Sequence, residues 1–75
     1  MDMHAVRSSN LRAIGYDAPT ATLGVTFTSG DTYHYAGVPR TVYDALRTAA
    51  PSHGTYFAQH IRPFFRGVKQ PKGRA

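Results

Sequence analysis

The sequence predicts a small α+β domain, in which an antiparallel β-meander of three to four strands is followed by two helices packed on one face. Two patterns support this class. Apolar residues alternate with polar ones over much of residues 1–38, whereas residues 39–66 carry apolar residues at helical spacing. The chain has only 75 residues, so we expect a single domain with a small hydrophobic core.

Four stretches in the first half have strand character. The third is the clearest, because Leu23, Val25 and Phe27 alternate with Thr and Gly, as in a strand with one buried face. Pro19 lies in the turn before it. The predicted strands cover residues 4–8, 11–17, 22–28 and 32–36.

The turn between the last two strands decides on which face Tyr33 and Tyr35 lie. We expect a three-residue loop, 28–30, with Gly30 in the left-handed conformation that glycine adopts without strain. This loop sets both tyrosines on the apolar face, opposite Val25 and Leu23. A two-residue loop would instead place them on the Thr-rich face. The register therefore decides whether the tyrosines belong to the core or are available for binding.

The first helix is expected to begin at Pro39, where the missing N–H costs nothing, and to be stopped by Pro51. Its apolar positions follow helical spacing, so one face should pack on the sheet. These positions are Val42, Tyr43, Leu46 and Ala49.

The second helix is expected from His53 onward, with Ser52 as its N-cap. Pro63 should end or kink it near residues 61–62. Phe64 and Phe65 would then lie in a short turn that closes the bottom of the core. The residues expected to form the core-facing stripe of this helix are Tyr56, Phe57, His60, Ile61 and Phe64.

The charge distribution points to an anionic partner. Nine Lys and Arg face four acids, all Asp, and five of the nine cations follow residue 61, where there is no acid. We therefore divide the chain into a domain, 1–67, and a basic flexible tail, 68–75. The alternative interpretation of the tail is a solvated end that only keeps the protein soluble.

No catalytic or metal site is predicted, and no cofactor. The chain lacks Cys and Glu, its four Asp are scattered, and it has no glycine-rich phosphate loop. His53 and His60 are seven residues apart, whereas metal ligands on a helix are typically three or four apart. Ser8 and Ser9 have no base at a recognisable spacing, so we interpret them as a strand end or turn. The absence of an apolar run or a signal pattern favours a cytoplasmic location.

An ordered set of short motifs resembles the KTSC domain, over roughly residues 6–66. The set consists of Val6-x-Ser8-Ser9-x-Leu11, Ile14-Gly15-Tyr16-Asp17, Leu23-x-Val25-x-Phe27-x-x-Gly30, Tyr33-x-Tyr35-x-x-Val38-Pro39, Val42-Tyr43-x-x-Leu46, Ser52-x-Gly54-x-Tyr56-Phe57 and Ile61-Arg62. The resemblance implies a domain found at the C-terminus of some lysyl-tRNA synthetases and as a stand-alone bacterial or phage protein. It implies no established activity, although RNA binding has been suggested. Ala58 departs from the family, where a polar residue, commonly Asn, follows the Tyr-Phe pair.

These observations predict a non-enzymatic domain that binds nucleic acid, preferably RNA, with cations on the phosphates and aromatic rings on the bases. The predicted binding residues are Tyr33, Tyr35, Arg62, Arg66, Lys69, Lys72 and Arg74. Two alternatives stay open: a protein–protein interaction module, and a small binder of a nucleotide-like anion. Salt dependence separates them, because contacts to several phosphates weaken steeply with salt.

Overall fold

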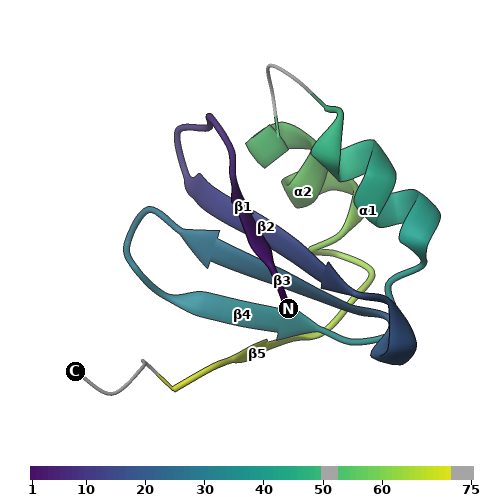
Figure 1. The fold of residues 1–75 in the computed structure, drawn as a ribbon. Helices are drawn as coiled ribbons and strands as arrows, with labels where there is room; N and C mark the ends of the chain where they lie inside the picture. Colours follow the sequence, from purple (N-terminus) through teal and green to yellow (C-terminus); the bar gives the residue numbers. More distant parts are fainter. Residues whose placement is uncertain (50–52, 72–75) are drawn as a thin grey trace.

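The computed structural model describes residues 1–49 and 53–71, and it consists of a five-stranded antiparallel sheet with two helices on one face (Figure 1). The strands lie side by side in chain order, so the sheet is a continuous meander. The α+β prediction is confirmed, with one strand more than expected. The elements are β1 (Met3–Ala5), β2 (Leu11–Asp17), a 3-10 turn (Ala18–Thr20), β3 (Thr22–Phe27), β4 (Thr32–Tyr35), α1 (Arg40–Arg47), α2 (His53–His60) and β5 (Gly67–Lys69).

The extra strand, β5, follows the helices and pairs with β4 at the edge of the sheet. Val68 and Lys69 therefore belong to the sheet, which corrects the predicted boundary between the domain and a flexible tail at residue 68. The N–H of Gln70 extends the pairing by donating to the carbonyl of Thr32 at 2.8 Å. A strand of three residues is too short to have a readable periodicity, and its partner strand lies more than 30 residues earlier.

The β3–β4 hairpin has the predicted register. Tyr33 lies opposite Val25, and Tyr35 lies opposite Leu23. The loop has three residues, 28–30, and Gly30 has a φ of +97°, in the region that favours glycine. The N–H of Phe27 donates to the carbonyl of Asp31 at 2.9 Å and closes the loop. Both tyrosines are thereby set on the face of the sheet that the helices cover.

The hydrophobic core lies between this face and the two helices. The ring of Tyr16 stacks on that of Tyr43 with 5.1 Å between centroids, which joins β2 to α1. The Tyr16 hydroxyl also donates to the carbonyl of Val38 at 2.6 Å. Aromatic packing of this kind lets a short chain bury much area with few residues. The buried core residues are Leu11, Ile14, Leu23, Val25, Tyr35, Val38, Tyr43, Leu46, Phe57 and Ile61.

Helix α1 begins one residue later than predicted. Pro39 has a ψ of 149° and precedes the helix as its N-cap, and its carbonyl accepts hydrogen bonds from the N–H groups of Val42 and Tyr43. At the other end, the hydroxyl of Thr48 donates to the carbonyl of Asp44 at 3.0 Å. The helix has thus ended before residue 50, and the predicted roles of Pro51 and Ser52 lie outside the described residues.

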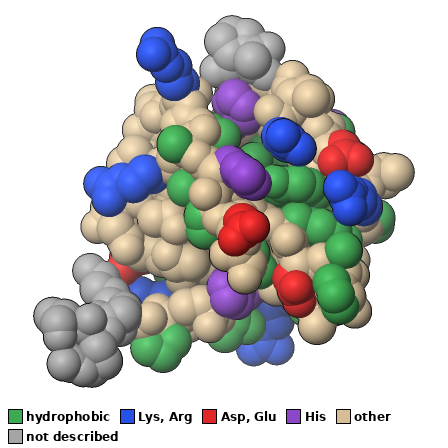
Figure 2. Space-filling model, viewed as in Figure 1, with side chains coloured by type: hydrophobic (Ala, Val, Ile, Leu, Met, Phe, Trp, Pro, Cys, Tyr) green, Lys and Arg blue, Asp and Glu red, His purple; other side chains and the backbone are tan. Residues whose placement is uncertain are grey.

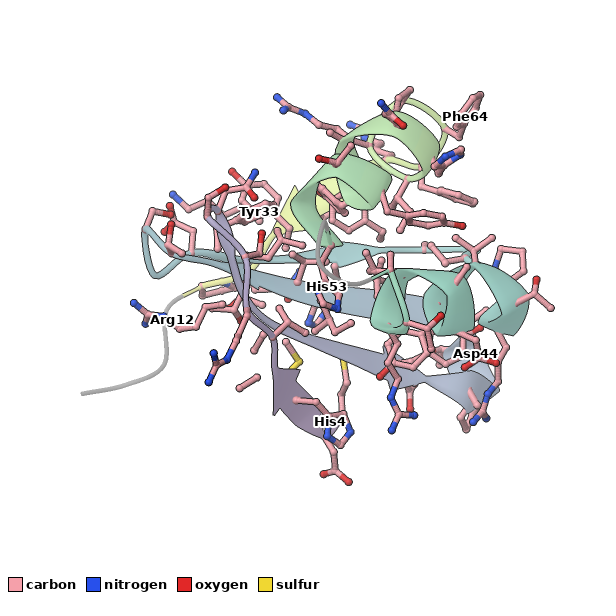
Figure 3. The ribbon with its side chains drawn as sticks, turned by 90° about the horizontal axis from the view of Figure 1, so that it is seen from above. His4, Arg12, Tyr33, Asp44, His53 and Phe64 are labelled. Atoms are coloured by element: carbon pink, nitrogen blue, oxygen red, sulfur yellow. The ribbon has the colours of Figure 1, made fainter. Side chains whose placement is uncertain are left out.

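Helix α2 ends at His60, and a turn follows over residues 61–65, as predicted. The prediction that Phe64 closes the core is wrong, because its side chain is 74% exposed and points away from the sheet (Figure 3). Phe65 is half-buried and packs against the core instead. The N–H groups of both phenylalanines donate to the carbonyl of Ile61, and this tight turn carries Phe64 outward.

Candidate nucleic-acid interface

An open pocket of about 440 Å³ lies between the β3–β4 hairpin and the end of α2, and we call it the aromatic pocket. Three of the predicted binding residues, Tyr33, Tyr35 and Arg62, line it together. The hairpin register brings the tyrosines to this face, and the turn after α2 places Arg62 beside them. The full lining is Asn10, Phe27, Thr28, Ser29, Asp31, Tyr33, Tyr35 and Arg62.

The two tyrosines have different roles. Tyr35 is 5% exposed and packs edge-on against Phe57, with 5.4 Å between ring centroids, so it belongs to the core. Tyr33 is half-buried, and its ring lies edge-on to that of Phe27 at 5.6 Å. Figure 3 shows Tyr33 close to the hairpin end of the sheet. Tyr33 and Phe27 are therefore the rings of this pocket with surface left for a ligand.

Arg62 supplies positive charge to the aromatic pocket. Burial raises the pKa of the Tyr35 hydroxyl above its usual 10.0, Arg62 opposes this rise, and Tyr33 adds to it. The carboxylate of Asp31, which also lines the pocket, lies 3.7 Å from the ammonium of Lys69. Lys69 is paired with Tyr33 across the sheet and so lies at the margin of the pocket. The charges around the pocket are two cations and one anion.

The raised pKa of Tyr35 predicts a loss of stability in alkali. A group whose pKa is raised in the folded state stabilises the fold below its unfolded pKa, and this contribution disappears as the pH rises through the folded pKa. The free energy of unfolding should therefore fall above about pH 10 more steeply than in Tyr35→Phe, which keeps the ring and lacks the hydroxyl. Urea unfolding of both proteins from about pH 8 to about pH 11 measures this difference. Parallel pH profiles would contradict it.

A second depression of about 360 Å³ adjoins the aromatic pocket, and we call it the polar pocket. Asn10 lines both pockets, and we refer to the two adjoining pockets together as the groove. The Ser8 hydroxyl donates to the amide oxygen of Asn10 at 3.1 Å. Gly54 fits closely here, because a Cβ at this position would overlap the Asn10 amide oxygen and lie 2.9 Å from the Ser8 hydroxyl. The polar pocket is lined by Ser8, Ser9, Asn10, Gly54, Thr55, Ala58 and Gln59.

The sequence predicts that Ser8 and Ser9 form a strand end or turn, and they lie in the connection between β1 and β2. Their position beside α2 was missed, as were the contributions of Asn10, Phe27 and Gln59 to the groove. One signal was available, because Ser8, Ser9 and Gly54 are among the residues that carry the family resemblance. Ala58 also lines the polar pocket.

The remaining predicted cations are not gathered at this groove. Arg66 is exposed and lines neither pocket, and Lys72 and Arg74 lie outside the described residues. On the face seen in Figure 2, Lys and Arg side chains occur at separate places and do not form one patch. On this face, the clustering of cations along the sequence therefore does not become one broad basic surface.

The histidines have other surroundings. His53 is 8% exposed, and its Nε2 lies 3.2 Å from the carbonyl oxygen of Arg47. The ring of His60 packs on that of Tyr56, with centroids 4.5 Å apart. Within residues 1–49 and 53–71, no three His, Asp or Glu side chains are placed to hold a metal ion. In the same ranges, neither helix has the length and apolar character to cross a membrane.

Comparisons with known proteins agree with this fold. A protein of Tsukamurella paurometabola is 42% identical over 66 residues, which cover 88% of this chain and 97% of the relative. A lysine–tRNA ligase of Nostoc is 41% identical over 58 residues, but these make up 10% of that enzyme. The crystal structure of a KTSC domain protein from Yersinia pestis superposes with a TM-score of 0.88 at 31% identity, covering 93% of this chain and 97% of that one.

Comparison with protein-family models identifies the family of this domain. The profile of the KTSC domain matches residues 7–65, a range that begins before β2 and ends in the turn after α2. It therefore includes both pockets of the groove and leaves out β5. Because this match covers most of the chain and agrees with the fold, the protein belongs to the KTSC domain family.

Proposed function

We propose that the domain binds single-stranded RNA, without catalysing a reaction, through the groove formed by the aromatic and polar pockets. The observation that carries this proposal is the meeting of Tyr33, Phe27 and Arg62 in one open pocket. Recognition of a single strand needs a cation for the phosphate and a ring face for a base. Both lie here within one pocket of nucleotide-like size.

Each part of the groove has a role in this proposal. A base stacks on the accessible part of Tyr33, and Arg62 contacts the adjoining phosphate with its forked donors. The neighbouring nucleotide lies in the polar pocket, where Asn10 and Gln59 offer amide donors and acceptors to a base edge or a 2′-hydroxyl. Tyr35 forms the buried floor and holds the other rings in place.

The family context supports RNA as the partner. Two relatives are lysine–tRNA ligases, of Nostoc and of Trichormus variabilis, enzymes whose substrate is an RNA. In each of them the similar segment is about a tenth of the chain, so it is an addition to a larger enzyme. A small RNA-binding domain would raise the local concentration of the substrate for such an enzyme.

Replacing Arg62 by glutamine should weaken binding of a short single-stranded RNA by about tenfold, because a charge-assisted hydrogen bond to phosphate is lost. Fluorescence anisotropy with a labelled oligonucleotide measures the change. Arg66→Gln is the matched control, since it removes the same charge four residues away, from an exposed site outside both pockets. Equal losses in the two variants would mean that only net charge matters and would overturn the role of the groove.

Salt dependence measures how many phosphates the groove contacts. The logarithm of the binding constant should fall with the logarithm of salt by about 0.7 per phosphate contacted, which gives a small slope for the one or two contacts expected here. A chain that ends after Pro71 tests Lys72 and Arg74 and retains β5, whereas removal of residues 68–75 would also remove sheet pairing. Absence of RNA binding at low salt, with a folded protein, would favour the protein-interaction alternative.

A further inference from the structure

A third cavity has a volume of about 520 Å³. It lies between β1, the C-terminal end of α1 and the N-terminal end of α2. It shares no lining residue with the aromatic or polar pocket. Four nitrogen-bearing side chains surround it: His4 and Arg7 come from β1 and the residues after it, Arg47 ends α1, and His53 begins α2. In Figure 2, histidines run along the middle of the face where β1 lies in front, with hydrophobic side chains beside them.

The charged side chains that line this cavity are all cationic, and Asp2 lies in the adjoining pocket that also contains His4 and Arg47. No carboxylate lines it, and neither Arg7 nor Arg47 pairs with a carboxylate anywhere in the described ranges. Arg40, by contrast, lies 3.9 Å from Asp44 on the outside of α1. Two unpaired guanidinium groups beside a cavity attract an anion, and their forked donors suit carboxylate and phosphate oxygens.

A buried ring nitrogen of His53 without a partner among the described residues is a second, independent indication of a ligand site. The His53 ring lies inside the molecule (Figure 3), with Nε2 against the carbonyl of Arg47. Its Nδ1 is buried and has no hydrogen-bond partner among the described residues. An unpaired buried polar atom costs about 1–3 kcal/mol, so proteins rarely retain one without a use. Because His53 also lines the cavity, this unpartnered nitrogen lies in a side chain that a bound ligand would contact.

The floor of the cavity is apolar. Val6 and Ile14 line it, and Ile14 is fully buried in the core. A site with an apolar floor and a few convergent polar groups is typical of small-molecule binding, and its volume is in the usual range. An inorganic ion would leave this floor without a partner, whereas a molecule with both an anionic group and an apolar body would contact both parts.

We propose that this cavity binds a small organic anion, in which a carboxylate or phosphate contacts Arg7, Arg47 and His53 and an apolar body packs on Val6 and Ile14. The site is independent of RNA binding in the groove, so either proposal can fail without the other. Binding here would also tie β1 to the helices, since the cavity walls come from both.

Benzoate, phenyl phosphate and benzyl alcohol serve as probes in an NMR titration of the ¹⁵N-labelled protein at fixed ionic strength. We expect at least one of the two anions to shift the amides of residues 4–7, 47 and 53 with a dissociation constant of about 1 mM or below. The two anions distinguish a carboxylate site from a phosphate site. Benzyl alcohol should bind at least about tenfold more weakly, because it lacks the charge.

Arg47→Gln should weaken binding of the preferred anion by about tenfold, and His53→Leu, which removes the buried nitrogen, should weaken it as well. Arg40→Gln is the matched control, from the same helix but outside the cavity, and should change nothing. If His53→Leu fails to fold, Arg47→Gln alone decides. Equal binding of benzyl alcohol, shifts confined to Tyr33 and Arg62, or no shift at all would each overturn the proposal.

Discussion

Replacing Leu23 by alanine is expected to lower the free energy of unfolding by about 2–5 kcal/mol. Leu23 is fully buried in β3, the middle strand of the sheet, where it lies opposite Tyr16 on one side and Tyr35 on the other. Its truncation leaves a cavity beneath both helices that rigid aromatic neighbours cannot fill. A domain of this size has a total stability of about 4–11 kcal/mol, so the change removes a large fraction of it.

Urea unfolding, followed by circular dichroism, measures this loss. Val68→Ala is the control, because Val68 is also on a strand but is 56% exposed, and its truncation should cost no more than about 0.5 kcal/mol. A loss below about 1 kcal/mol in Leu23→Ala would contradict a core centred on β3.

Replacing Gly67 by alanine is expected to destabilise the domain by about 1–3 kcal/mol and to disturb the aromatic pocket. A Cβ on Gly67 would lie 2.5–2.9 Å from three atoms of the Tyr35 side chain, two in the ring and the hydroxyl oxygen, closer than side chains pack. Tyr35 cannot easily yield, since its ring is buried against Phe57. Either β5 must separate from β4 or the floor of the pocket must shift, so RNA binding should weaken together with stability.

Gly24→Ala provides a matched comparison in the same sheet. The three atoms nearest to a Cβ there belong to the side chains of Met1 and Met3, which are flexible and lie at the exposed amino-terminal end, so the cost should be small. In the double variant Gly67→Ala with Tyr35→Leu, the smaller side chain should remove part of the clash. Additive losses in a double-mutant cycle would contradict a direct conflict between Gly67 and Tyr35.

The local parts of the fold were predictable from the sequence. The alternation of Leu23, Val25 and Phe27 identifies β3, and the spacing of Gly30 from them sets the hairpin register that the structure has. Pro63 predicts an end of the second helix near residues 61–62, and α2 ends at His60. These features depend on neighbours in the chain. Their physical basis is the side-chain period and the allowed φ, and a few consecutive residues determine both.

The candidate groove was predictable in part. Tyr33, Tyr35 and Arg62 were singled out, and the structure brings them to one pocket. Asn10 was not singled out, because nothing in its local sequence distinguishes it from any turn residue. Its position between the two pockets depends on the packing of the β1–β2 connection against Gly54, more than 40 residues away.

The sequence by itself determined the class of the domain, its hairpin register and the types of side chain available for binding. Tertiary structure alone decided that Tyr35 is buried while Phe64 is exposed, that residues 67–69 form a fifth strand, and that Arg7, Arg47 and His53 meet at one cavity. The physical reason is that periodicity reports which face of an element is apolar, whereas burial and charge clustering depend on which elements that face meets.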